Sequence, residues 1–495
     1  MLWRGTDAYV QTVYPPGAGT ILRHGPLYCT LSRVPLWVGY LISGSGPIVS
    51  LGHFIKHSQL TETGVFALVL LQHAAVWCAA LYLIRSIGRT LPARLFLAMF
   101  FATHPLFYTF AHCIGSETLS MILALFLAGN GARLFLRYPN IRLRDWIIFT
   151  ALLCSCILTR HINSVLAAIL PMTIGLLMIE RCLHAFAPHR NAIPAVNFNL
   201  SKATRMWLVS IAVGLIALLS ATSFTHLLCW RAHIQWRSTF GYTFLWRLNF
   251  LDPMPTILRN GFLDSMASKC KLPETRRLLE TLKDRFGKTK PWDPPSFLRE
   301  EGARLFSSGG KVQEEKFDRS LNEMTNAFLW PPGAALRSAA LSDFHHATRL
   351  GEGDVVHYLF TSTDSLFDLR ERTPQLSRLK TFRQPRDKLI KVSKLSYFQW
   401  WNALSFRSWV LLGCVAFVLA LIVEYKRGGA NVPLILFSGC LCSLGVIMVL
   451  LNSFCVQLLP RFILPMMEFL LISMMILLGL IFRGCKIPEH ERRWK

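Results

Sequence analysis

Long runs of apolar residues are the feature that most restricts the fold of this chain. Several of nine such runs approach or exceed the roughly 20 residues that an α-helix needs to cross about 30 Å of hydrocarbon. The runs cover residues 63–85, 93–113, 117–136, 146–159, 162–180, 206–229, 407–424, 432–453 and 462–482. Backbone groups inside lipid must satisfy their own hydrogen bonds, and continuous helices do so. We therefore predict an all-α membrane protein, a polytopic helical bundle of about nine or ten transmembrane helices with a mostly helical external domain.

The composition agrees with lipid as the solvent. Of 495 residues, 52% are hydrophobic and 16% are charged, whereas soluble domains carry about 25% charged residues. Lys and Arg number 53 against 28 Asp and Glu, which gives a formal net charge of +25. These basic residues form short clusters between the apolar runs, a pattern that sets orientation in membranes. We therefore expect the lipid bilayer, and not nucleic acid, to be the partner of the positive charge.

The basic clusters also predict which side of the membrane each connection occupies. Basic connections alternate with sparsely charged ones, provided that residues 230–405 lie outside. The C-terminus is then cytoplasmic, and an odd number of spans places residues 1–62 outside. An external N-terminus without a signal peptide or a preceding helix is unusual. We therefore expect a first transmembrane helix upstream of Met1.

This topology divides the chain into five parts. Residues 26–55 are apolar but broken by Pro and Gly, so we expect interfacial or re-entrant helices there and not a clean span. The parts are a first external loop with interfacial helices (1–62), a transmembrane part of about six spans (63–229), an external soluble segment (230–405), the last three spans (406–482) and a basic cytoplasmic tail (483–495).

A sparse set of charged residues is predicted at the external edge of the bundle. These are Asp7, Glu117, Arg160 and Arg461. Charges close to hydrocarbon are unfavourable and mark functional sites by default. The alternative for each is an interfacial side chain that reaches water. For Glu117, which follows Ser116 at the start of a span, a helix cap is a further alternative.

Four local patterns at these positions resemble the GT-C superfamily of membrane glycosyltransferases. The patterns are GTDAYVQ at 5–11, RHGPLYCTL at 23–31, HPLFYTFAHCIGSETLSMILALFLAGNGARLF at 104–135, and TRHINSVLAAILP at 159–171 together with LLPRFILPMMEF at 458–469. The resemblance covers roughly 1–230 and 405–482. It rests on the order and shared sidedness of these patterns.

The resemblance implies transfer of a sugar from a polyprenyl-phosphate donor to a glycan, lipid or protein acceptor on the external or periplasmic face, with inversion. Asp7 would be the general base or would orient the acceptor, because inverting transfer needs a carboxylate to take the acceptor proton. Arg160 and Arg461 would hold the lipid phosphate in bidentate hydrogen bonds. Glu117, Tyr9 and His24 would complete the substrate-binding site. Within this superfamily, the chain resembles the polyprenyl-phosphate-dependent mannosyltransferases and aminoarabinose transferases.

Two other functions remain open on the sequence. A transporter or flippase for lipid-linked glycans would also be polytopic, although such proteins usually place polar residues near mid-membrane. A catalytically silent membrane protein of the same fold is the other alternative. No cofactor is implied with certainty. A divalent metal would suit the family, but the first loop holds no DxD motif. We expect a multi-pass protein of a bacterial inner membrane.

Overall fold

The computed structural model is mostly helical in the segments that it describes. These are residues 25–44, 46–57, 60–138, 140–186, 200–231, 240–285, 303–308, 311–361 and 396–482, with single positions 233, 236 and 238. The strands in this part of the chain are β1 (Ser307–Ser308) and β2 (Lys311–Val312), which pair antiparallel. The all-α fold class is confirmed.

Within the described residues, seven helical segments are long and apolar enough to cross a membrane. They are α6 (Glu62–Ile87), α9 (Ser116–Leu136), the segment formed by η1 (His161–Ala168) and α11 (Ile169–Phe186), α12 (Leu200–Arg231), α25 (Phe406–Lys426), α26 (Val432–Cys455), and the segment formed by η5 (Pro460–Ile463) and α27 (Leu464–Phe482). The chain is therefore a multi-pass integral membrane protein.

The two other runs that we expected to span form shorter helices. The run 93–113 is divided into α7 (Leu91–Thr103) and α8 (Pro105–Ala111). His104 between them is extended, with φ −86° and ψ 112°, because a residue before proline avoids the helical conformation. The run 146–159 lies within α10 (Leu143–Thr159), whose 17 residues reach about 26 Å.

The described residues fall into two compact units. The first combines Met1–Leu228, Leu350–Met448 and Leu464–Lys495, and the second combines Cys229–Arg349 and Val449–Ile463. Helices α20 (Glu352–Thr361) and α24 (Ser396–Asn402) belong to the first unit. Both come from the 230–405 segment that we expect outside the membrane.

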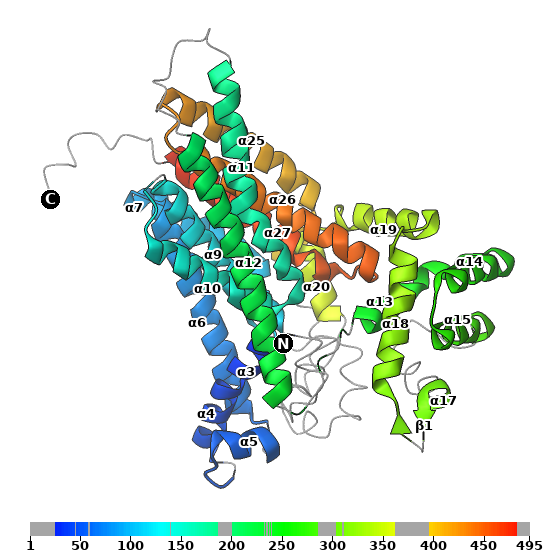
Figure 1. The fold of residues 1–495 in the computed structure, drawn as a ribbon. Helices are drawn as coiled ribbons and strands as arrows, with labels where there is room; N and C mark the ends of the chain where they lie inside the picture. The colour runs from blue at the N-terminus through cyan, green and yellow to red at the C-terminus, as the bar shows by residue number, and fades with distance from the viewer. Residues whose placement is uncertain are drawn as a thin grey trace, which may run out of the picture. The chain divides into compact units, whose positions relative to one another are not determined.

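The first unit is a helical bundle (Figure 1). Its helix α27 is almost entirely buried. Helix α6 packs against α9, α9 packs against α10, and α27 packs against α6, α7, α9 and α25. Reciprocal hydrogen bonds join α26 to α27, since the hydroxyls of Ser438 and Ser473 each donate to the other's carbonyl oxygen, at 3.1 and 2.8 Å. A helix that is apolar on every side, like α27, suits such a central position.

Residues 26–57 form three helices that are too short to span. They are α3 (Pro26–Leu31), α4 (Arg33–Ser43) and α5 (Leu51–His57). Helix α4 packs on the start of α6 so closely that a Cβ at Gly39 would lie 2.4 Å from the Cα of Gly64. Its other face exposes Val34, Val38 and Ile42. This apolar face is typical of an interfacial helix. The placement of α4 at the membrane surface stays a prediction.

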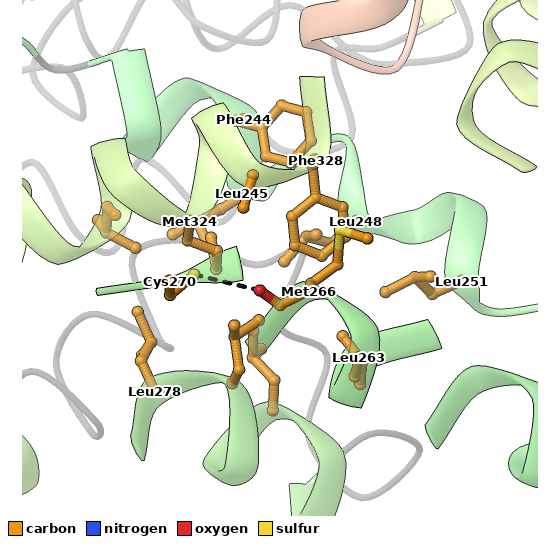
Figure 2. Close-up of a cluster of buried hydrophobic side chains, with 14 of the residues drawn as sticks. Phe244, Leu245, Leu248, Leu251, Leu263, Met266, Cys270, Leu278, Met324 and Phe328 are labelled. Atoms are coloured by element: carbon orange, nitrogen blue, oxygen red, sulfur yellow. Dashed lines mark hydrogen bonds between the residues drawn. The ribbon is translucent and has the colours of Figure 1, made fainter. Parts of the chain in front are cut away.

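The second unit is a small helical domain. Its elements are α13 (Phe240–Leu245), η2 (Leu248–Leu251), α14 (Thr256–Lys269), α15 (Pro273–Arg285), α17 (Ala303–Phe306), α18 (Glu314–Leu329) and α19 (Ala334–Ala347), together with β1 and β2. Figure 2 shows its core, where Phe244, Met266 and Phe328 converge with leucines from several helices. Burial of these side chains stabilises the domain by roughly 25 cal/mol per Å² of apolar surface.

Candidate functional site

The structure brings two of the predicted site residues together. Glu117 lies in the first turn of α9, and Arg160 follows the last residue of α10. Asp7, Tyr9 and His24 lie outside the described residues.

Arg461 lies in η5, and its guanidinium carbon is 4.9 Å from the ring centre of Phe462. That turn belongs to the second unit. The predicted role of Arg461 in phosphate binding therefore stays a prediction.

Glu117 and Arg160 form a largely buried ion pair. Arg160 Nη1 lies 3.7 Å from Glu117 Oε1, and the two side chains are 17% and 4% exposed. The N-cap of α9 is Gly115, which offers no side-chain cap. The second carboxylate oxygen, Glu117 Oε2, is buried and has no hydrogen-bond partner among the described residues. The carboxylate is thus held by charge, and the capping interpretation finds no support in this geometry.

A close backbone contact positions the residue before Arg160. Gly25, which precedes α3, has φ +75°, and a Cβ there would lie 2.5 Å from the carbonyl oxygen of Thr159. Only glycine combines this conformation with this approach. The start of α3 is therefore fixed against the end of α10.

Tyr28 then joins α3 to the start of α9. Its hydroxyl donates to Gln72 Oε1 at 2.9 Å and accepts from the backbone N–H of Gly115 at 3.0 Å. Gln72 Nε2 in turn donates to the carbonyl oxygens of Ala111 and Cys113. This buried network holds in place the backbone that carries Glu117.

Asn163 fixes the turn that follows Arg160. Its Nδ2 donates to Ser120 Oγ at 2.9 Å and to the carbonyl oxygen of Cys156 at 2.8 Å. The turn is thereby tied to both α9 and α10. Because Arg160 lies between these anchors, its backbone has little freedom.

Glu468 is a member of the site that the sequence patterns did not reveal to us. It lies in α27, is 2% exposed, and its Oε1 has no hydrogen-bond partner among the described residues. Arg160 is the cation whose charge acts on it. The signal that could have found it is a lone acidic residue inside the apolar run LPMMEFLL.

Among the described residues, the histidines near the predicted external edge have partners or are exposed. His104 Nδ1 lies 2.6 Å from Glu352 Oε1, and both side chains are buried. His73 Nε2 lies 3.3 Å from His112 Nδ1. His161 is exposed. Within the described segments, no group of three or more His, Cys, Asp or Glu side chains could hold a metal ion.

The arrangement of Glu117, Arg160 and Glu468 offers two kinds of chemistry. A guanidinium can bind a carboxylate or phosphate oxygen, and buried carboxyl groups can accept, hold or donate a proton. Ionisable side chains inside a membrane bundle are typical of functional sites.

Comparison with protein-family models, with curated proteins and with solved structures gave no match to this chain. The fold and the site define a class: a multi-pass integral membrane protein with a buried carboxylate–guanidinium cluster formed by α9, the end of α10 and α27.

Proposed function

We propose that this protein is a membrane glycosyltransferase that moves a sugar from a polyprenyl-phosphate donor to an external acceptor. The observation that supports it is the buried Glu117–Arg160 pair. Residues of three GT-C-like patterns meet around it, since Tyr28 binds Gly115 and the residue before Arg160 packs against Gly25.

The proposed reaction proceeds with inversion at the anomeric carbon. Asp7 takes the proton of the acceptor hydroxyl while the acceptor oxygen attacks the anomeric carbon. The bond from that carbon to the phosphate oxygen breaks, and the electron pair leaves with the polyprenyl phosphate. Arg160 and Arg461 stabilise the charge of the leaving phosphate. Glu117, Tyr9 and His24 bind the substrates.

The orientation and the compartment are part of the same proposal. The basic tail at 483–495 and the other basic connections favour a cytoplasmic C-terminus. The site then faces the periplasm of a bacterial inner membrane. The acceptor is a glycan, a lipid or a protein.

Purified protein in proteoliposomes tests the reaction. The donors are polyprenyl phosphates that carry a hexose or an aminopentose, a total membrane extract supplies acceptors, and release of free polyprenyl phosphate is measured. Asp7→Asn should abolish release, and Glu117→Gln should reduce it by about 10²-fold.

The matched control is Glu180→Gln. It removes a carboxylate that lies 3.2 Å from Arg181 near the C-terminal end of α11. This variant should leave the release of polyprenyl phosphate unchanged. Normal turnover by Asp7→Asn would reject the assignment of the base.

A transporter for lipid-linked glycans is the second candidate. Glu468 lies inside an apolar spanning helix, and buried acids at such positions are typical of proton-coupled transport. Uptake of labelled lipid-linked glycan by proteoliposomes, without any covalent product, would favour this function over transfer.

A further inference from the structure

The cluster around Arg160 holds more acidic groups than basic ones. Glu117 and Glu468 are 3% and 2% exposed, and Arg160 lies 3.7 Å from Glu117 and also acts electrostatically on Glu468. With all three groups ionised, the cluster would carry a net charge of −1. An uncompensated charge is strongly unfavourable at a site removed from water. A neutral cluster of these three groups requires a proton on one of the two carboxyl groups.

The surroundings decide which carboxyl group is neutral. Glu117 lies 3.7 Å from the guanidinium and in the first turn of α9, where the helix dipole favours a negative charge. Glu468 lies beyond the first turn of α27 and forms no ion pair within 4 Å with a described residue. Among the described residues, the thiol of Cys156 also interacts electrostatically with Glu468, and the thiol of Cys113 with Glu117. Neither thiol supplies a positive charge.

We propose that Glu468 is a neutral carboxylic acid beside an ionised Glu117–Arg160 pair, and that these groups bind an uncharged hydroxyl group. Glu117 Oε2 and Glu468 Oε1 are both buried and lack hydrogen-bond partners among the described residues. An ionised carboxylate only accepts hydrogen bonds, whereas a protonated one also donates. A hydroxyl group can both donate a hydrogen bond, as Glu117 requires, and accept one, as Glu468 requires.

A phosphate group fits this cluster poorly. It brings further negative charge to Glu117 and offers mainly acceptor oxygens. The hydroxyl therefore belongs to a sugar or another uncharged part of a substrate. The assignment of the ligand rests on the proposed glycosyl transfer, in which the acceptor supplies such a hydroxyl. The protonation of Glu468 is independent of the proposed function.

Infrared difference spectroscopy on the full-length protein in nanodiscs tests the protonation. A protonated carboxyl group has a carbonyl stretch that is separate from the carboxylate bands and shifts in heavy water. We expect this band in the wild type at neutral pH, its loss in Glu468→Gln, and its retention in Glu117→Gln and in the control Glu180→Gln. A band that persists in Glu468→Gln, or is lost in Glu117→Gln, overturns the proposal. If Glu468→Gln does not fold, Glu468→Asp takes its place and should shift the band. An unshifted band in Glu468→Asp would also overturn the proposal.

Kinetics test the ligand. Glu468→Gln keeps a neutral donor, so the KM for the acceptor should stay within about threefold of the wild type. Glu468→Leu removes the donor and should raise that KM about tenfold, with the KM for the donor lipid unchanged. A rise in the donor KM alone overturns the hydroxyl assignment. Absence of transfer by the wild type with the band present would reject the glycosyltransferase function and retain the neutral acid.

Discussion

His104 Nδ1 lies 2.6 Å from Glu352 Oε1, although 248 residues separate the two positions in the chain. His104 is the break between α7 and α8, and Glu352 opens α20. Both side chains are buried, and the rings of Trp401 and Trp409 lie 4.7 and 5.1 Å from the imidazole. The pair therefore joins the break between α7 and α8 to the start of α20, which comes much later in the chain.

We predict that Glu352→Ala destabilises the first unit. Removing the carboxylate leaves His104 Nδ1 and the backbone N–H of Leu106 without their buried partner, at a cost of about 1–3 kcal/mol for each. Thermal unfolding in detergent should show a clearly lower midpoint. Tyr397→Phe, which removes exposed hydrogen bonds to Tyr108 and to the carbonyl oxygen of Thr103 in the same region, serves as the control and should cost about 1 kcal/mol. Equal midpoints for both variants would contradict the prediction.

Tyr28→Phe should weaken the site without removing a charge. The hydroxyl accepts from the buried N–H of Gly115, so its loss leaves that donor unsatisfied, at a cost of about 1–3 kcal/mol. Denaturant titration measures the loss. The matched variant Tyr40→Phe removes a longer bond, 3.2 Å, to the carbonyl oxygen of Pro47. A larger effect of Tyr40→Phe would argue against the network around Gln72.

Two glycines in the second unit provide a paired test of its packing. A Cβ at Gly241 in α13 would lie 2.5 Å from the backbone carbonyl carbon of Leu321, so Gly241→Ala should destabilise by about 1–3 kcal/mol. A Cβ at Gly261 in α14 would meet no atom within 4 Å, and Gly261→Ala should stabilise by up to about 1 kcal/mol. Resistance to limited proteolysis should change in opposite directions, and a shared direction would contradict this packing.

Glu323 predicts an acid-sensitive link in the second unit. Its carboxylate accepts from the backbone N–H groups of Lys271 and Leu272 at 2.7 and 3.2 Å. Partial burial alone would raise the pKa of Glu323, but the Thr275 side chain, these amides and nearby Arg276 together lower it. A lowered pKa means that the stabilisation is complete above the ordinary value of 4.5 and is lost as the pH falls through the folded-state pKa.

The wild type should therefore lose thermal stability below about pH 4.5 more steeply than Glu323→Gln. Glu315→Gln is the control, because Glu315 is exposed and lies 3.8 Å from Arg319 on the same helix. That variant should follow the wild-type pH dependence. A Glu323→Gln profile identical to that of the wild type would contradict the prediction.

The fold class was predictable because it depends on the length of apolar runs. Seven of the nine runs are long spanning helices. The break at His104 was within reach of the sequence, since Pro105 excludes a helical conformation at the preceding residue. The pairing of His104 with Glu352 was not, because only the packed structure relates positions so far apart.

The candidate site was predictable in part. Glu117 and Arg160 stand out as charges at the ends of apolar runs, and the structure pairs them. Glu468 escaped notice because its neighbours in LPMMEFLL are typical of a lipid-facing helix, whereas burial of α27 on all sides makes it part of the interior. Burial by other helices is a tertiary property that hydropathy along one segment does not report.

Among the described helices, the one at the centre of the bundle is also the one that the ribosome makes last. Until α27 is inserted, the sides of α6, α7, α9 and α25 that will contact it lack this neighbour. Assembly of the interior therefore has to wait until α27 has been synthesised. Nonsense mutations before Leu464 should consequently yield chains that insert into the bilayer but are cleared by quality-control proteases, and partial products would not retain partial function.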